Sequence, residues 1–104
     1  NVVVSALTAN DDARSYIREN IPNLILTYLM CPIEICIQRD SRGLYREARE
    51  GKINPKTLIG LESPYPAPES PDLIIDTSKQ VPEQNIAVLK RWFIQAGYDY
   101  FCEE

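Results

Sequence analysis

Histidine is absent from this 104-residue sequence, and cysteine, glycine and methionine are scarce. The lack of histidine excludes a Ser-His-Asp triad and every zinc site that uses a histidine ligand. The three cysteines, Cys31, Cys36 and Cys102, form no CxxC pair, and their odd number argues against a disulfide framework. We therefore interpret them as thiols in a reducing compartment and expect a cytoplasmic protein.

Long hydrophobic runs are also lacking. The longest apolar stretch, "NLILTYLMCPI", is interrupted by Asn23, Thr27 and Pro32, and it is far shorter than the roughly 20 apolar residues of a membrane-spanning helix. We expect neither a membrane partner nor a signal peptide. With 44% hydrophobic and 25% charged residues, the composition is that of an ordinary globular protein, and the length suits one domain over residues 1–104.

Short apolar runs alternate with amphipathic segments along the chain. The expected strands cover residues 1–7, 23–30 and 72–76, and the expected helices begin at Asp11, Pro32 and Pro82. Residues 64–71 hold four of the eight prolines and predict an extended connection. The alternation indicates an α/β fold with a parallel sheet. Ligands in such folds bind at the carboxyl ends of the strands, so "SALTAN", "MCPI" and "IDTSKQ" should meet at one edge.

The last predicted helix carries an apolar stripe that should face the sheet. The stripe consists of Ile86, Leu89, Trp92, Phe93 and Ala96, and Gly97 follows as a helix stop. We expect this helix to pack through Trp92 and Phe93.

Positive charge is concentrated in one segment of a chain whose formal net charge is −4. Six of the eleven basic residues lie between residues 39 and 56, and Arg42, Arg46 and Arg49 recur at helical intervals, with Leu44 and Ala48 facing inward. One interpretation is a solvated helix whose arginines pair with nearby acids. The other is a clamp for phosphate, because guanidinium groups match phosphate oxygens bidentately. Nucleic acid is disfavoured as a partner, because the segment is short and holds a single aromatic residue.

The order of several motifs along the chain indicates a family, which the spacing of the arginines alone does not. "CPIEICIQRDSRGLYREAREGKI" and the later "SPYPAPESPDLIIDT" resemble the carboxyl half of adenylylsulfate kinases, the P-loop kinases that phosphorylate adenosine phosphosulfate with ATP in sulfate assimilation. The resemblance implies part of a three-layer α/β/α fold with a parallel sheet and a lid over about residues 41–60. It also implies small nucleotide substrates, ATP and Mg²⁺, and formation of 3'-phosphoadenosine phosphosulfate. A homodimer is left open.

The resemblance assigns roles to eight positions. It implies acceptor binding by Leu7, Thr8 and Arg42, ATP binding by Arg39, Thr77 and Gln80, and a lid role for Arg46 and Arg49. Arg14 and Arg18 match basic positions of the family, but they equally suit a surface helix.

Two departures from the family pattern limit these expectations. "INPKTLIG" lacks the phenylalanine that stacks on the acceptor's adenine in the family, a contact worth about 1–3 kcal/mol, so a different small acceptor is an alternative. None of the four glycines belongs to a G-x-x-x-x-G-K-[ST] loop. The missing loop and the start without Met together predict that the chain is the second half of a kinase domain. We therefore expect no catalytic residue in this chain, Mg²⁺ ligands elsewhere in the protein and no kinase activity of the chain alone. A noncatalytic interaction module is the competing hypothesis.

Overall fold

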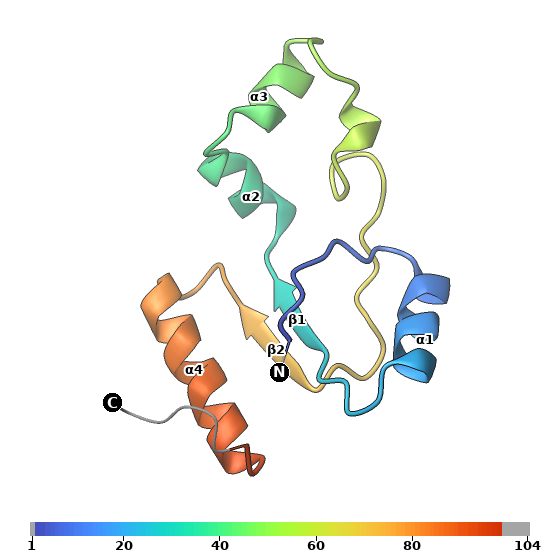
Figure 1. Ribbon diagram of the computed structural model, residues 1–104. Coiled ribbons are helices and arrows are strands. Elements are labelled where there is room, and N and C mark those ends of the chain that lie inside the picture. The colour runs from blue at the N-terminus through green and yellow to red at the C-terminus, as the bar shows by residue number, and fades with distance from the viewer. Residues whose placement is uncertain (1, 99–104) are drawn as a thin grey trace.

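The computed structural model describes residues 2–98, which form a small α/β arrangement (Figure 1). Its elements, in chain order, are α1 (Asp11–Asn20), β1 (Thr27–Met30), α2 (Ile33–Arg39), α3 (Leu44–Arg49), the 3-10 helix η1 (Pro55–Thr57), β2 (Leu73–Asp76) and α4 (Pro82–Gln95). The proline-rich stretch of residues 64–71 is neither helix nor strand, as predicted.

The two strands pair in parallel, which confirms the predicted sheet type. Their register runs from Thr27 opposite Leu73 to Met30 opposite Asp76. The Asp72 carboxylate accepts a hydrogen bond from the backbone nitrogen of Leu26 at 2.7 Å and fixes the start of the pair. β1 is shorter than the run of residues 23–30 that predicted it, because pairing with β2 begins only at Thr27.

The apolar run at the start of the chain does not form the buried strand that its β-branched residues predicted. Val2, Val3, Val4 and Leu7 are all exposed, Val3 to 97%. A strand that is apolar on both faces needs neighbours that supply hydrogen bonds and cover. In the described part of the chain, β1 and β2 pair only with each other, and no hydrogen bond links residues 2–7 to either strand. The prediction is therefore wrong for this structure.

Helices α1 and α4 lie on opposite sides of the strand pair (Figure 1). α4 begins with Pro82 in its first turn, and the Gln84 side chain accepts a hydrogen bond from the Val81 nitrogen at 3.1 Å. It packs against β2 as predicted, with half-buried Trp92 and Phe93 in edge-to-face contact at 5.3 Å between ring centroids. Gly97, with φ +89°, follows the helix. The rest of the stripe is only partly covered, since Ile86 is exposed.

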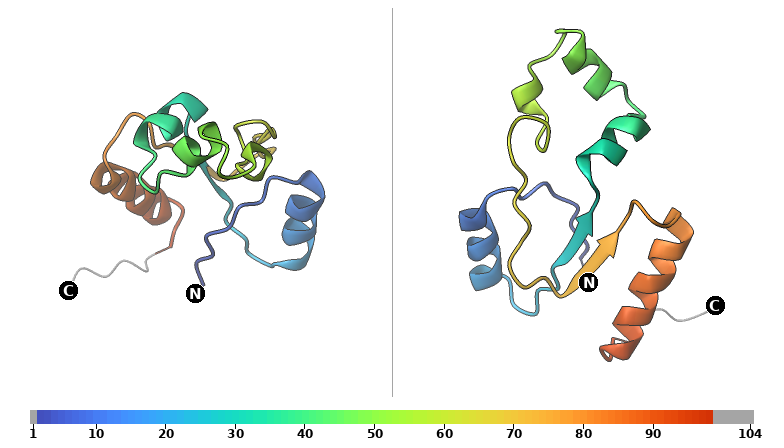
Figure 2. Two further views of the ribbon diagram at one scale, coloured as in Figure 1. Left: turned by 90° about the horizontal axis from the view of Figure 1, so that it is seen from above. Right: turned by 180° about the vertical axis from the view of Figure 1, so that it is seen from behind.

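α2, α3 and η1 form an arm that extends beyond the carboxyl ends of the strands (Figures 1 and 2). Because of this arm, the chain is less compact than a closed domain of the same length. Its accessible surface is 8346 Å², whereas a compact monomer of this mass exposes about 6,000 Å². Its radius of gyration is 16.2 Å, against about 13 Å for a closed domain of this length. Among the described apolar side chains only Ala48 and Ile75 are buried, so the core of the strand pair is incomplete.

Candidate functional site

The carboxyl ends of β1 and β2 bring two of the three predicted edge segments together. The backbone nitrogen of Thr77 donates to the Met30 carbonyl at 2.9 Å, and the Thr77 hydroxyl donates to the same oxygen at 3.2 Å. The segments "MCPI" and "IDTSKQ" therefore meet at one edge, as parallel pairing requires.

Arg39, the last residue of α2, reaches across this edge. Its Nη2 donates to the Thr77 carbonyl at 2.7 Å, and its Nη1 lies 3.9 Å from the Cys31 sulfur. Two of the three residues predicted for the ATP side, Arg39 and Thr77, are thus in direct contact. The third, Gln80, is exposed just before α4.

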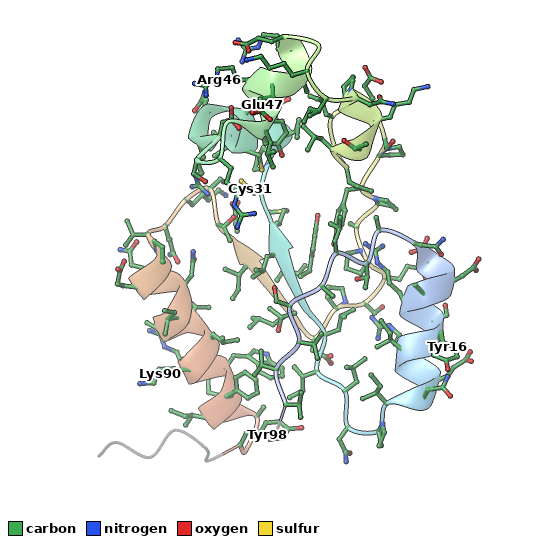
Figure 3. The ribbon with its side chains drawn as sticks, turned by 45° about the horizontal axis from the view of Figure 1, so that its top comes forward. Tyr16, Cys31, Arg46, Glu47, Lys90 and Tyr98 are labelled. Atoms are coloured by element: carbon green, nitrogen blue, oxygen red, sulfur yellow. The ribbon has the colours of Figure 1, made fainter. Side chains whose placement is uncertain are left out.

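The two cysteines at this edge are free thiols. Cys31 directly follows β1 and lies at the end of that strand that faces α2 (Figure 3). Burial raises the pKa of the Cys36 thiol, and its hydrogen bond with Cys31 raises it further. A thiol with a raised pKa is a poor nucleophile at neutral pH. Covalent catalysis by Cys36 is therefore disfavoured.

Asp76, the last residue of β2, provides a fixed negative charge. Its carboxylate accepts hydrogen bonds from the Ser78 hydroxyl and from the Ser78 backbone nitrogen, the latter at 2.9 Å, and these bonds lower the pKa of the carboxyl group. The Lys79 ammonium lies 3.5 Å away. The edge thus combines a cationic guanidinium, a carboxylate and a threonine hydroxyl.

Asp40 organises the entry into the basic helix α3. Its carboxylate oxygens accept hydrogen bonds from the backbone nitrogens of Tyr45 at 3.0 Å and Arg46 at 3.1 Å. Gly43, between them, has φ +70°, a conformation that side chains with a β-carbon rarely adopt. The turn therefore depends on both Asp40 and Gly43.

We expect Asp40→Ala to destabilise the intact protein by about 1–2 kcal/mol, because the first turn of α3 loses both acceptors. Urea unfolding followed by circular dichroism measures the change. Asp40→Asn keeps one acceptor oxygen and should lose less. Equal stability of Asp40→Ala and wild type would mean that these hydrogen bonds contribute nothing.

The arginines of the basic segment have no acidic partner among the described residues. No ion pair involves Arg42, Arg46 or Arg49. Of the acids nearby, Asp40 is bound to backbone nitrogens and Glu50 pairs with Lys52 at 2.9 Å. The pairs that the solvated-helix interpretation predicts are therefore not formed.

Arg46 and Glu47 lie at the end of the molecule formed by the arm (Figure 3). The Arg46 Nη2 lies 2.9 Å from the point where a β-carbon on Gly43 would stand, so its guanidinium folds back over the turn. Ala48 is buried as predicted, whereas Leu44, also expected to face inward, is 38% exposed. Leu44 is the first residue of α3.

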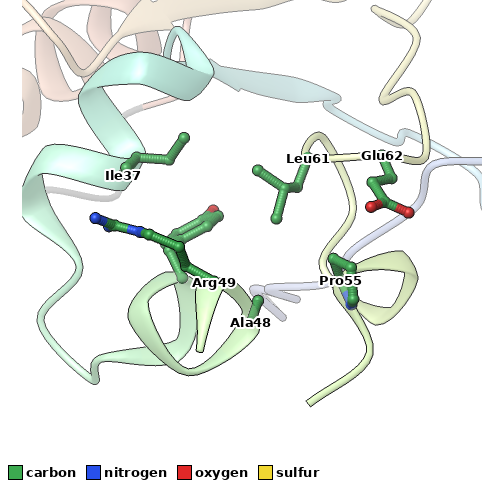
Figure 4. Close-up of a pocket in the computed structure, with 7 residues that line it drawn as sticks. Ile37, Ala48, Arg49, Pro55, Leu61 and Glu62 are labelled. Carbon is green, nitrogen blue, oxygen red and sulfur yellow. The ribbon is translucent and has the colours of Figure 1, made fainter. Parts of the chain in front are cut away.

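A cavity of about 370 Å³ lies between α2, α3, η1 and the loop that follows η1 (Figure 4). It is lined by Ile37, Tyr45, Ala48, Arg49, Pro55, Leu61 and Glu62. Burial raises the pKa of the Tyr45 phenol, which therefore stays protonated at neutral pH. Arg49 and Glu62 add opposite charges to a largely apolar lining. The cavity therefore lies on the side of α3 that faces η1 and the following loop.

The predicted acceptor residues Leu7 and Thr8 lie in the loop before α1. Leu7 is exposed, and the Thr8 carbonyl accepts a hydrogen bond from Arg14 Nε at 2.7 Å. The N-cap of α1 is Asn10, whose side-chain oxygen accepts from the Asp12 nitrogen at 2.7 Å. Within residues 2–98, no hydrogen bond joins Leu7 or Thr8 to Arg42, the third predicted acceptor residue.

The sequence did not predict the burial of Arg14, because a surface helix accounted equally well for its position. Its side chain is only 5% exposed and its guanidinium lies over the Tyr65 ring, 5.3 Å from the centroid. Arg18 is exposed, as expected for a surface helix, and donates to the carbonyls of Glu69 and Ser70. Asp11, three residues before Arg14, is the only local signal that separates the two arginines in the described chain. The burial of Arg14 could not be predicted from it, because the ring that covers Arg14 lies in the proline-rich stretch.

Comparison with known proteins decides the family. The profile described as adenylylsulphate kinase matches residues 1–76. The chain belongs to the adenylylsulphate kinase family. It is 36% identical over 97 residues to the adenylyl-sulfate kinase of Synechococcus sp. (strain JA-3-3Ab) and 37% identical over 86 residues to that of Halothermothrix orenii. It is also 32% identical over 96 residues to a probable bifunctional SAT/APS kinase 2 of Sorangium cellulosum.

The chain corresponds to part of these adenylylsulphate kinase relatives. The alignments cover 93% and 83% of this chain but 54% and 45% of the Synechococcus and Halothermothrix proteins. For the Sorangium protein the shares are 92% and 16%. The chain thus spans about half the length of the two adenylyl-sulfate kinases. Within residues 2–98, none of the helices has the length and hydrophobicity needed to cross a bilayer.

Proposed function

We propose that the intact protein transfers the γ-phosphoryl group of ATP to the 3'-hydroxyl of adenosine phosphosulfate and so forms 3'-phosphoadenosine phosphosulfate. The observation that carries this proposal is the set of arginines Arg42, Arg46 and Arg49, which have no acidic partner in the described part of the chain. Phosphoryl transfer depends mainly on positioning and on charge neutralisation, and guanidinium groups provide both. The names of the relatives support the choice of substrates.

Each substrate is given its own residues in this proposal. Leu7, Thr8 and Arg42 bind the acceptor, and Arg39, Thr77 and Gln80 bind ATP. The contact between Arg39 and the Thr77 carbonyl supports the ATP side, because it holds the guanidinium at the carboxyl edge of the strands. An exposed, oriented guanidinium plane can stack on an adenine ring.

Residues 41–60 act as a lid in this proposal, with Arg46 and Arg49 closing over the phosphates. The arm that contains them extends beyond the strand ends, where ligands of parallel sheets bind. Closure of such a segment excludes water and strengthens the contacts between arginines and phosphate.

Magnesium would neutralise phosphate charge when bound, but the residues described here do not fit a site for it. No group of three Cys, Asp or Glu residues in residues 2–98 is placed to hold a metal ion. We therefore assign no step to the ion in this chain and propose that its ligands lie elsewhere in the intact protein. We likewise propose a cytoplasmic enzyme with nucleotide substrates; the free thiols Cys31 and Cys36 suit a reducing compartment.

A kinase of a different small acceptor is the second candidate. It is favoured by the segment of residues 53–60, which lacks the aromatic residue expected to stack on the acceptor's adenine. The noncatalytic alternative is favoured only by the incomplete cover of the strand pair.

The intact protein, incubated with ATP and Mg²⁺, should produce 3'-phosphoadenosine phosphosulfate from adenosine phosphosulfate, measured by chromatography of the nucleotides. Adenosine monophosphate, which lacks the sulfate, is the matched control acceptor and should react poorly. Equal use of both acceptors would favour the different-acceptor kinase. No transfer to any nucleotide would favour the noncatalytic module.

A further inference from the structure

Arg14 is the only charged side chain that is buried within residues 2–98, at 5% exposed. It projects from the second turn of α1 and takes part in three kinds of contact. Its Nε donates to the Thr8 carbonyl at 2.7 Å, its Nη1 pairs with Asp11 at 3.1 Å, and its guanidinium covers the Tyr65 ring. Burying a charge is costly unless it is paired, so this arrangement needs an explanation.

The contacts of Arg14 connect segments that lie far apart in the sequence. Tyr65 belongs to the proline-rich stretch, and its ring stacks on that of Tyr28 in β1 with 6.3 Å between centroids. A continuous path therefore runs from Thr8 through Arg14 and Tyr65 to Tyr28. The loop before α1 is linked by this path to the strand pair, although no hydrogen bond joins residues 2–7 to β1 or β2.

The guanidinium group is better suited to this link than any other cation. Two of its nitrogens donate to a carbonyl and a carboxylate, while the flat face rests on an aromatic ring. The link is formed even though the Nη2 of Arg14 is buried without a hydrogen-bond partner within the described residues. Local helix stability does not require this, because α1 already has Asn10 as its N-cap.

We propose that Arg14 is a positioning residue for the acceptor site, which it controls by fixing the Thr8 backbone relative to β1. This inference rests on the proposed function, in which Leu7 and Thr8 bind the acceptor. Arg14 itself touches no substrate. It determines where the loop of residues 5–10 stands, and so it affects the acceptor rather than ATP.

Arg14→Lys in the intact protein tests this role. Lysine keeps the charge and can still pair with Asp11, but one ammonium group cannot hold the Thr8 carbonyl and cover the Tyr65 ring in the same geometry. We expect the KM for the acceptor to rise about ten-fold, the KM for ATP to change less than about two-fold, and kcat to change little.

Arg18→Lys is the matched control, since Arg18 lies on the same helix and binds carbonyls of the proline-rich stretch instead of the loop. Its acceptor KM should stay at the wild-type value. A second pair of variants varies the ring: Tyr65→Leu should raise the acceptor KM as Arg14→Lys does, and Tyr65→Phe should not. An equal rise of both KM values in Arg14→Lys, or a loss of kcat alone, would overturn the proposal.

Hydrogen exchange of the same intact variants gives a readout that needs no activity. Arg14→Lys should speed exchange at the amides of residues 12–14, which donate to Asn10 in that loop, relative to those of residues 72 and 73, which donate to the Leu26 carbonyl, and Arg18→Lys should not. Uniform acceleration throughout the chain would show a general loss of stability and would overturn the positioning role. If the wild type phosphorylates no acceptor, the proposed function fails, and this comparison alone decides whether Arg14 fixes the loop.

Discussion

The 104-residue chain by itself is expected to transfer no phosphate from ATP to adenosine phosphosulfate. None of its four glycines lies in a G-x-x-x-x-G-K-[ST] sequence, so it has no loop whose backbone nitrogens surround the phosphates and no lysine at that position. In the part of the chain that the structure describes, no acidic cluster is placed to hold the metal ion either. A coupled assay for ADP, with the intact protein as the positive control, measures the difference.

The sharpest control for this prediction is the isolated chain with Arg42→Ala. Trace activity from a contaminating kinase would be the same with and without this substitution. Turnover by the isolated chain that Arg42→Ala abolishes would contradict the prediction and would require a phosphate site among these residues that has not been identified.

In the intact protein, Arg42→Ala and Arg39→Ala should have opposite selectivity. Arg42→Ala should raise the KM for the acceptor and Arg39→Ala the KM for ATP. A charge-assisted contact is worth about 1.5–3 kcal/mol, which corresponds to roughly a ten- to hundred-fold change. The prediction follows from position: Arg39 is held on the Thr77 carbonyl at the strand ends, whereas Arg42 is exposed in the turn before α3 without an ion pair in the described chain.

Steady-state kinetics with each substrate varied in turn measures this selectivity. Arg91→Ala is the matched control, since Arg91 is an exposed arginine on α4 with no assigned role, and both KM values should remain unchanged. Small and equal effects of Arg42→Ala and Arg39→Ala on both substrates would show that the arginines form only a solvated surface.

The sequence predicted those elements whose stability depends on neighbours along the chain. The alternation of apolar runs and amphipathic segments predicted β1, β2 and the helices α1, α2 and α4, and the two strands pair in parallel as expected. Helix starts were predictable because a proline in the first turn and polar capping groups act within a few residues. The spacing of Arg42, Arg46 and Arg49 predicted one shared helix face, which is wrong for Arg42, because α3 begins at Leu44 after the left-handed Gly43 and only Arg46 and Arg49 lie on it. The ordered motifs predicted the family that the profile confirms.

Only the tertiary structure decided which of these residues are covered and which are joined. The run at residues 2–7 has the composition of a buried strand but is exposed. A strand forms only where another strand offers a hydrogen-bonding edge, and the composition of the run gives no information about such a partner. Arg14 and Arg18 lie one turn apart on α1, yet one is buried and the other exposed, because Tyr65 folds back over the first alone. The contact between Arg39 and Thr77 likewise depends on parallel pairing of strands that lie far apart in the chain. Local propensity acts over a few residues, whereas burial and cross-strand contacts are set by segments that meet only after folding.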